Sequence, residues 1–350
     1  MIWSIRKSIE NIGNYNINDW VASLKKGCLI YYAEANKLVI YSLSNLKVVS
    51  TRKIKCNNSF YYLDDNRLMI NQDNKLYSSD FKLQKFEKIC DTSEERISFL
   101  GDGFCIGRTS SRRPRISRNE IISTWNNQVL YRWDDDKQLI KWNEELHLFH
   151  TKFKGDLFAL NLENNGLLWK IILDDGISGR RYIEYLDNDE LIVQRYFKVD
   201  RNNLLRLDLN TGSILWELEH TFPYYNYDES TCKLYGLGGK TFEVINAETG
   251  ERELQKELKE NLHIASHLTY YDNGYLFFSG YRDTNVPVFG AVNVEDGKLV
   301  FTQEVEMVGE KSFRKGLDRP VVVGNRLYVR DSMKTLHVFE KEETKEQQYS

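Results

Sequence analysis

Residues Leu204–Leu218, LLRLDLNTGSILWEL, contain a complete β-hairpin. Leucines at every second position from 205 to 209 alternate with polar residues, which is the spacing of a strand with one buried face. Asn-Thr-Gly at 210–212 supplies the turn, because glycine enters the left-handed backbone conformation without steric cost. Apolar residues alternate again from Ile214 to Leu218, so the stretch predicts two antiparallel strands joined by a tight turn.

The same hairpin recurs along the chain, as Leu157–Trp169, Phe242–Arg252 and Ala291–Phe301. A second hairpin, in which an apolar residue precedes an Asp, Asn or Gly turn and a β-rich strand, recurs at intervals of roughly 37 to 51 residues. We count about eight copies, at Leu24–Leu29, Leu63–Leu68, Leu100–Phe104, Trp142–Leu146, Leu186–Leu191, Tyr227–Thr231, Tyr271–Leu276 and Val323–Leu327. Two hairpins per repeat at this spacing are typical of the four-stranded blade of a propeller.

The repeats predict an all-β fold, an eight-bladed β-propeller of four-stranded blades, with seven blades as the alternative if the weak third repeat is not one blade. The last predicted blade lacks a fourth strand, and Ile2–Arg6 matches the return strand Leu168–Ile171. We therefore expect the N-terminal strand to complete the last blade, which removes an open sheet edge. A single domain over 1–342 and a charged C-terminal tail over 343–350 follow. The predicted blades are 17–54, 58–90, 95–135, 138–173, 181–220, 222–258, 262–306 and 313–342, closed by 1–9.

Two further predictions depend on the repeat register. Trp169 and Trp216 occupy equivalent positions, so we expect both to be structural and buried between blades. The segment Glu251–Leu262 has leucines four residues apart among strong helix formers, which by propensity predicts a helix. The register instead predicts a strand followed by a loop, and we favour the register.

The hairpins Ala159–Trp169 and Leu207–Trp216 resemble the quinoprotein-type, or PQQ-like, β-propeller repeat, and the resemblance covers nearly the whole chain. It implies a propeller fold without fixing an activity, because that family holds dehydrogenases, outer-membrane assembly scaffolds and many binding proteins. Its quinone enzymes hold their cofactor with a calcium ion and typically a disulfide between adjacent cysteines. No two cysteines are adjacent in this chain, so we expect no quinone and no other cofactor.

Composition excludes some classes of function. The chain has 350 residues, 41% of them hydrophobic, and a net charge of -3, so it has no general attraction to nucleic acid or to an anionic membrane. The five dispersed cysteines fit free thiols in a reducing cytoplasm, and no stretch approaches the ~20 apolar residues of a membrane helix. His263 and His267 lack a third metal ligand at a supporting spacing, and Asp134–Asp136 is expected to be a solvated loop. The sequence therefore predicts a cytoplasmic protein without a metal site.

The loops between the second and third strands of the predicted blades are rich in cations, with an excess of about ten positive charges in this acidic chain. The longest, Gly107–Asn119, holds five arginines, and the guanidinium group binds carboxylate or phosphate through paired hydrogen bonds. In a propeller these loops open on one face. The predicted partner-binding residues on this face are Arg108, Arg112, Arg113, Arg115, Arg118, Arg195, Lys198, Arg201, Tyr281 and Arg282.

These observations favour a monomeric, non-enzymatic binding protein, a scaffold, adaptor or inhibitor of the immunity type, whose basic loop face receives an acidic protein surface. One alternative is an enzyme acting on a glycan with two carboxylates in the central funnel, a pair that the sequence does not single out. A second alternative is binding of nucleic acid through the same arginines.

Overall fold

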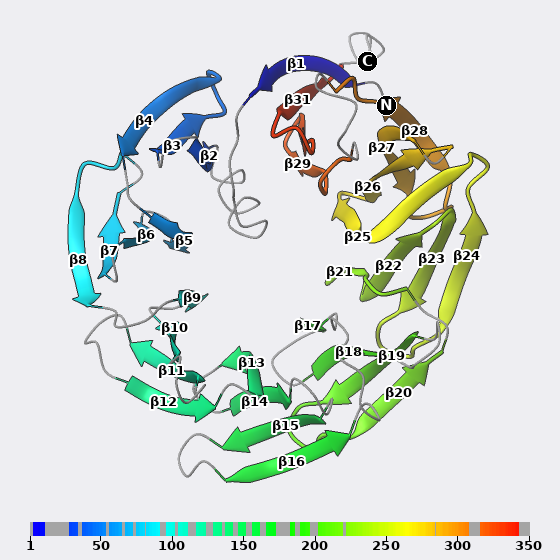
Figure 1. Ribbon diagram of the computed structural model, residues 1–350. Helices are drawn as coiled ribbons and strands as arrows, with labels where there is room; N and C mark the ends of the chain where they lie inside the picture. The colour runs from blue at the N-terminus through cyan, green and yellow to red at the C-terminus, as the bar shows by residue number, and fades with distance from the viewer. Residues whose placement is uncertain are drawn as a thin grey trace. The chain divides into compact units, whose positions relative to one another are not determined.

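The described part of the chain consists of β-strands joined by turns (Figure 1). No helix among the described residues is long and apolar enough to span a bilayer. By its internal contacts the chain divides into two compact units, residues 11–138 and residues 1–10 with 139–350. The computed structural model describes residues 3–10, 28–33, 37–53, 56–64, 67–72, 75–80, 82–91, 96–101, 104–110, 117–123, 129–134, 137–142, 146–151, 156–161, 166–172, 183–185, 190–196, 202–219, 222–283, 285–307 and 316–342.

In the unit of residues 11–138, the described strands form three sheets whose strands neighbour one another in chain order. Leu38 and Ile40 on β3 pack with Leu68 and Ile70 on β6, so the first two sheets share a core. The sheets are β2 (Cys28–Ala33), β3 (Lys37–Ser42) and β4 (Lys47–Lys53); β5 (Cys56–Asp64), β6 (Arg67–Gln72), β7 (Lys75–Ser79) and β8 (Phe86–Asp91); and β9 (Arg96–Gly101), β10 (Phe104–Ser110), β11 (Ser117–Ser123) and β12 (Val129–Asp134).

The other unit contains five four-stranded sheets within its described residues, the first of which begins at the boundary between the units. They are β13 (Lys137–Trp142), β14 (Leu146–Thr151), β15 (Asp156–Asn161) and β16 (Leu167–Ile172); β17 (Ile183–Tyr185), β18 (Glu190–Tyr196), β19 (Asn202–Asp208) and β20 (Ile214–Leu218); β21 (Asn226–Asp228), β22 (Lys233–Gly238), β23 (Thr241–Asn246) and β24 (Arg252–Glu257); β25 (Leu262–Asp272), β26 (Tyr275–Arg282), β27 (Val286–Asn293) and β28 (Leu299–Glu304); and β29 (Val321–Val323), β30 (Arg326–Arg330) and β31 (Leu336–Lys341) with β1 (Trp3–Ile9). The sheets lie at the ranges that the repeats predict. The tail over 343–350 is outside the described residues, and the single domain over 1–342 stays a prediction.

Burial along the strands shows where the core of this unit lies. The inner strands β23 and β27 are buried at nearly every position, whereas the fourth strand β24 alternates between half-buried and exposed residues. An inner strand has both faces covered because a neighbouring sheet packs on each side, as in stacked sheets elsewhere. One core cluster joins the sheet β21–β24 to the sheet β25–β28 and includes Phe242, Leu262 and Phe278. A second joins β25–β28 to the last sheet.

The N-terminal strand completes the last sheet. β1 pairs antiparallel with β31, from Trp3 opposite Lys341 to Ile9 opposite Leu336. Trp3 is buried and meets Phe277 edge to face, with ring centroids 6.4 Å apart. The pairing that the sequence predicted between the two ends of the chain is confirmed.

The segment with helical propensity is a strand. Residues Arg252–Glu257 form β24, and Val244 on β23 lies opposite Leu254. The register prediction is therefore confirmed over the propensity prediction, because pairing with β23 and packing of alternate residues outweigh a weak local preference.

Candidate functional site

A tryptophan on the fourth strand ties each of two sheets to the next sheet along the chain. Trp169 on β16 donates its indole Nε1–H to the carbonyl oxygen of Leu209, at 2.6 Å. Trp216 on β20 donates in the same way to the carbonyl oxygen of Ala247, at 3.0 Å. Both contacts agree with the structural role predicted from the sequence; Trp169 is buried as predicted, whereas Trp216 is only half-buried.

The glycine of the receiving turn lies directly against each indole ring. A Cβ atom on Gly212 would stand 2.6 Å from Cδ2 of Trp169, and one on Gly250 would stand 2.7 Å from Cδ2 of Trp216. Both glycines have a positive φ, +73° and +75°. Only glycine satisfies the turn geometry and the close approach of the ring together.

Leu254 occupies the tryptophan position in the sheet β21–β24. In each sheet this residue pairs with the third strand immediately before a register shift. Trp169 is opposite Ala159, Trp216 is opposite Arg206, and Leu254 is opposite Val244. The shorter leucine side chain has no ring to extend toward the next sheet.

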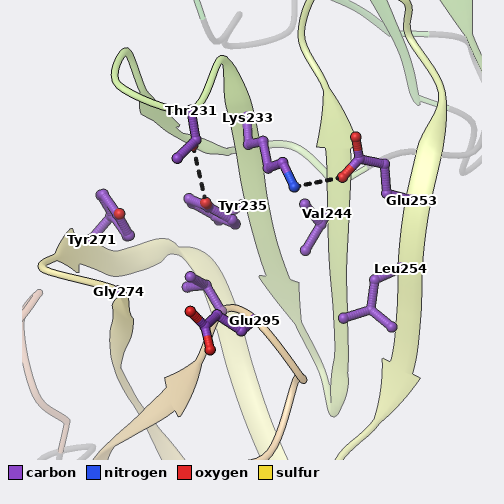
Figure 2. Close-up of a pocket in the computed structure, with 10 residues that line it drawn as sticks. Thr231, Lys233, Tyr235, Val244, Glu253, Leu254, Tyr271, Gly274 and Glu295 are labelled. Carbon is purple, nitrogen blue, oxygen red and sulfur yellow. Dashed lines mark hydrogen bonds and ion pairs between the residues drawn. The ribbon is translucent and has the colours of Figure 1, made fainter.

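A pocket of about 440 Å³ lies at this junction, between the sheets β21–β24 and β25–β28 (Figure 2). This volume is within the usual range for small-molecule and side-chain pockets, roughly 300–1,000 Å³. The pocket is at the end of the sheets that carries the turns between first and second and between third and fourth strands. Its lining residues are Thr231, Lys233, Tyr235, Val244, Glu253, Leu254, Tyr271, Gly274, Val294 and Glu295.

One wall of the pocket is apolar and aromatic. Val244 and Val294 belong to the core cluster beneath it, and the partly buried Leu254 packs against that cluster. The rings of Tyr235 and Tyr271 lie 4.9 Å apart between centroids and are inclined by 30°. At this separation and inclination the two phenol rings lie over each other in an offset stack beside the aliphatic floor.

The hydroxyl groups of these tyrosines belong to a chain of hydrogen bonds that ends on Asp228. Thr231 Oγ1 donates to Asp228 Oδ2 at 2.8 Å, and the Tyr271 hydroxyl donates to the same oxygen at 2.8 Å. The Tyr235 hydroxyl lies 3.3 Å from Thr231 Oγ1. Since the only hydroxyl hydrogen of Thr231 is already donated to Asp228, Tyr235 is the donor in this contact.

Burial and this network shift the pKa values of the groups in it. Burial opposes ionisation of Asp228, but hydrogen bonds from Ser230, Thr231 and Tyr271 outweigh it and hold the pKa of the carboxyl below its usual range. Burial, and then the hydrogen bond to Asp228, raise the pKa of Tyr271. Burial also raises the pKa of Tyr235. Asp228 is therefore a carboxylate at neutral pH, and both tyrosines are protonated.

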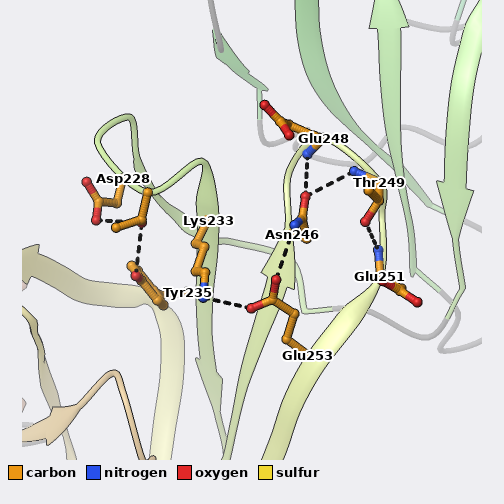
Figure 3. Close-up of polar contacts among 9 residues, drawn as sticks. Asp228, Lys233, Tyr235, Asn246, Glu248, Thr249, Glu251 and Glu253 are labelled. Atoms are coloured by element: carbon orange, nitrogen blue, oxygen red, sulfur yellow. Dashed lines mark hydrogen bonds and ion pairs between the residues drawn. The ribbon is translucent and has the colours of Figure 1, made fainter.

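An ion pair forms the opposite wall (Figure 3). Lys233 Nζ lies 2.8 Å from Glu253 Oε2, and both side chains are about one-third exposed. Asn246 Nδ2 donates to the other oxygen of Glu253 at 3.1 Å, while Asn246 Oδ1 accepts from the backbone N–H groups of Glu248 and Thr249. The turn thus fixes Asn246, which in turn fixes the carboxylate of Glu253.

The arrangement is suited to binding rather than to proton transfer. Its two phenols are held neutral by their raised pKa values, and its lysine is held charged because the hydrogen bond that Lys233 donates to Glu253 raises the lysine pKa. Among the described residues, no group of three or more His, Cys, Asp or Glu side chains is placed to hold a metal ion. The pocket therefore offers an aromatic surface, an apolar floor and oxygen acceptors.

The structure describes part of the predicted arginine-rich loop. Arg108 lies on β10 and Arg118 on β11, where Thr109 pairs with Arg118. The strands therefore include residues 107–110 and 117–119, which the sequence assigned to the loop, and residues 111–116 lie outside the described residues. Arg195 lies on β18. The remaining predicted cations of these loops lie outside the described residues: Arg112, Arg113, Arg115, Lys198 and Arg201.

Arg282 and Tyr281, the last two predicted binding residues, lie at the end of β26. Arg282 Nη1 is 2.7 Å from a carboxylate oxygen of Glu304, and Nη2 is 3.3 Å from one of Glu260. Arg282 also donates to Thr302 Oγ1 at 2.6 Å. The charge of Arg282 is thus neutralised within its own sheet, which reduces its value for a partner.

A serine, a histidine and an aspartate meet at the N-terminal strand. His337 Nε2 lies 2.9 Å from Asp331 Oδ2, and His337 Nδ1 lies 3.2 Å from Ser8 Oγ. Asp331 also accepts the backbone N–H groups of Met333 and Thr335, both at 2.9 Å. Because Asp331 shapes the turn before β31 and Ser8 belongs to β1, the three residues fasten β1 to its neighbour.

The pocket was not predicted from the sequence. The available signal was the break in the repeat at Leu254, where the preceding copies carry tryptophan. In the sequence alone Leu254 is one of the leucines that favour a helix, and a pocket depends on what the next sheet places opposite this position.

No family model matches this sequence, and no curated protein matches it. Among solved structures, the chain is similar to the C-terminal WD40 domain of Sif2, with 10% identity, a TM-score of 0.65 and coverage of 98% of this chain and 99% of that one. It is also similar to BamB from Moraxella catarrhalis, with 13% identity, a TM-score of 0.57 and coverage of 98% and 99%. A third similar structure is Chaetomium thermophilum Sqt1 bound to the N-terminus of the ribosomal protein L10, with 12% identity, a TM-score of 0.58 and coverage of 91% and 94%.

These similarities identify the fold. WD40 domains and BamB are β-propellers, and the likeness extends over nearly all of each chain. The chain is therefore a β-propeller protein built from antiparallel, mostly four-stranded sheets.

Proposed function

We propose that this β-propeller is a non-enzymatic protein-binding protein, a cytoplasmic scaffold, adaptor or inhibitor that acts as a monomer. In this proposal its propeller has eight blades and belongs to the PQQ-like type, with β1 closing the ring and residues 1–342 forming one domain. An acidic protein surface binds at the end of the sheets that carries the loops between second and third strands. The binding residues are those predicted from the sequence, with Arg282 contributing least because Glu304 and Glu260 already neutralise it.

The observation that carries the proposal is the β10–β11 hairpin. Arg108 and Arg118 lie near the ends of paired strands, and the sequence between these strands contains three further arginines. Five like charges within one hairpin repel one another, so the arrangement costs free energy until anions approach. An acidic protein surface supplies carboxylates that match the guanidinium groups in pairs. Similarity to a propeller that was solved with a ribosomal protein segment bound to it supports a protein as the partner.

Charge reversal within the loop tests the proposal. Arg112→Glu with Arg115→Glu should leave folding intact, because exposed loop substitutions usually change stability by less than about 0.5 kcal/mol. The double variant should bind its partner more slowly at low salt, since charges at an interface rim mainly steer encounter. The measurement is a pull-down from the native host followed by association kinetics with the captured partner.

A matched control makes the same change in charge at turns between third and fourth strands, within the same unit of residues 11–138. Lys47→Glu with Lys85→Glu alters two exposed lysines at turns between third and fourth strands. This control should capture the same partner as wild type. Identical partners and rates for all three proteins would refute the loop proposal, and capture of nucleic acid whose affinity falls steeply with salt would replace it.

A further inference from the structure

At the pocket beside Leu254, a hydrogen bond that is present at the two preceding junctions is missing. In the two preceding sheets an indole N–H from the fourth strand reaches a turn carbonyl of the next sheet. The equivalent turn residue after Leu209 and Ala247 is Val294, which lines the pocket. The leucine side chain has no hydrogen-bond donor, and none of the described residues donates a hydrogen bond to the Val294 carbonyl. The residue that carries the equivalent backbone acceptor therefore lines the pocket.

The rest of the tryptophan site is not simply empty. At this junction the turn glycine is Gly297, and a Cβ on it would meet Phe242 at 3.0 Å and Lys256 at 3.2 Å. These two side chains cover the glycine in place of an indole, and Lys256 Nζ donates to the carbonyl of Asp296 at 2.9 Å. Side chains therefore fill the space next to Gly297, whereas the space next to Tyr235 and Tyr271 is the open pocket.

The hydrogen-bonding capacity of the lining side chains indicates which kind of ligand the pocket can bind. The Tyr271 hydroxyl donates its hydrogen to Asp228 and the Tyr235 hydroxyl donates its hydrogen to Thr231, so neither phenol has a hydrogen left to donate and each can act toward a ligand only as an acceptor. Glu295 is exposed at the rim, and none of the described residues donates a hydrogen bond to its carboxylate. Lys233 is the one cation of the lining, and Glu253 already pairs with it. A ligand rich in donors and without acceptors fits this set.

The charges point the same way. Lys233 is balanced by Glu253, which leaves the carboxylates of Glu295 and, behind the tyrosines, Asp228 in excess. A positive charge entering the pocket meets two phenol rings, whose faces attract cations. A guanidinium group is planar, carries five donors and no acceptor, and stacks on aromatic rings better than an ammonium group does.

We propose that the pocket between the sheets β21–β24 and β25–β28 binds an arginine side chain of a partner polypeptide. The guanidinium packs against the stacked Tyr235–Tyr271 pair and donates to Glu295, and the aliphatic stem lies on Leu254, Val244 and Val294. This inference rests on the protein-binding function proposed above, but it assigns a second site at the opposite end of the sheets from the loops. The rim is made of turns, so a polypeptide backbone can pass over it while one side chain enters.

The test uses N-acetyl-arginine methylamide as the probe and the full-length protein, with binding followed by ligand-observed NMR and titration calorimetry. The neutral citrulline analogue has nearly the same shape and no charge. We expect saturable binding of the arginine probe and at least about tenfold weaker binding of the citrulline probe, since charge-assisted hydrogen bonds are about twice as strong as neutral ones. Equal binding of the two probes, or no saturable binding of the arginine probe, would overturn the proposal.

Three variants locate the site. Leu254→Trp places in β24 the residue that Trp169 and Trp216 supply in the preceding sheets, and it should fill the pocket and abolish probe binding. Glu295→Gln should weaken binding roughly threefold to tenfold by removing one exposed carboxylate. The matched control is Glu248→Gln, the same exposed position in the preceding turn, where Trp216 fills the junction, and its binding should equal that of wild type.

Each outcome decides between the proposals. If Leu254→Trp melts at or above the wild-type temperature and still binds the probe, the pocket is not the site. If Leu254→Trp fails to fold, the comparison of Glu295→Gln with Glu248→Gln carries the test alone, and equal affinities would refute the assignment. Failure of the probe to bind leaves the partner captured in the pull-down unaffected, so this inference and the proposed function can fail separately.

Discussion

Replacing Gly212 by alanine should separate the cost of the turn conformation from the cost of displacing a tryptophan. Gly212 has a φ of +73°, and a Cβ there would meet Trp169 at 2.6 Å. Gly324 has a φ of +61° and no atom within 4 Å of the same Cβ. Gly324→Ala should therefore lower the free energy of unfolding only by the cost of the left-handed backbone conformation, about 1 kcal/mol. Gly212→Ala has the same backbone cost and in addition displaces the indole ring of Trp169.

The added cost follows from what the ring loses. Moving Trp169 breaks its hydrogen bond to the Leu209 carbonyl, worth about 1 kcal/mol, and overpacking adds at least about 1 kcal/mol. Gly212→Ala should therefore destabilise the protein by about 3 kcal/mol, against about 1 kcal/mol for Gly324→Ala. In a Trp169→Ala background, which itself costs about 3–5 kcal/mol, the effect of Gly212→Ala should fall to about 1 kcal/mol because no ring is left to displace.

The assay is urea denaturation followed by far-ultraviolet circular dichroism, since removal of a tryptophan alters fluorescence. The m-value of each variant shows whether the same cooperative unit unfolds. A coupling free energy of about 2 kcal/mol between Gly212 and Trp169 supports the packing described. Equal destabilisation by Gly212→Ala and Gly324→Ala, or additive effects in the double variant, would refute the reasoning.

Three other changes give distinct expectations. Deleting residues 1–9 should expose the edge of β31 and cause aggregation or a large fall in melting temperature, measured by light scattering during heating; unchanged melting would contradict the closing role of β1. Arg252→Ala leaves the buried carboxylate of Glu243 without its cation at 2.8 Å and should cost about 3–5 kcal/mol in urea denaturation, whereas a loss below about 1 kcal/mol would show that the pair contributes little. Asp228 has a lowered pKa when folded, so its stabilising effect is present above the unfolded carboxyl pKa of about 3.9 and is lost as pH falls through the lower folded value; Asp228→Asn should flatten the acid dependence of stability in that range, and an unchanged slope would contradict the assignment.

The sequence was sufficient for the repeat architecture because each hairpin carries its own local signals. Alternating leucines, an Asx-type turn and a glycine of positive φ define strands and turns without knowledge of the neighbours, as at Asp208, whose side chain accepts the N–H groups of Asn210 and Thr211. The pairing of β1 with β31 was also predictable, because the terminal strand repeats the pattern of the other fourth strands.

Sites between sheets were harder to predict because they depend on pairs of residues about forty positions apart. Trp169 was recognised as structural, but its partners, the Leu209 carbonyl and Gly212, follow only from the packing of consecutive sheets. In the same way the sequence predicted Arg282 as a loop cation available to a partner, whereas the structure pairs it with Glu304 and Glu260. Charge counted along a sequence does not show which charges neutralise each other across a sheet.

A repeat protein gives an internal reference for finding such sites. When equivalent positions share one residue, that residue makes a contact on which the fold depends. Here the residue is tryptophan, whose indole N–H donates to a turn carbonyl of the next sheet. Where one copy departs from the others, the fold must replace that contact in another way or leave a space. At Leu254 the chain does both, since Phe242 and Lys256 cover Gly297 while the side facing the two tyrosines stays open. Because a fully packed junction would gain more buried apolar contact, the retention of stacked tyrosines, a fixed ion pair and unused acceptors around this space is better explained by a ligand than by stability.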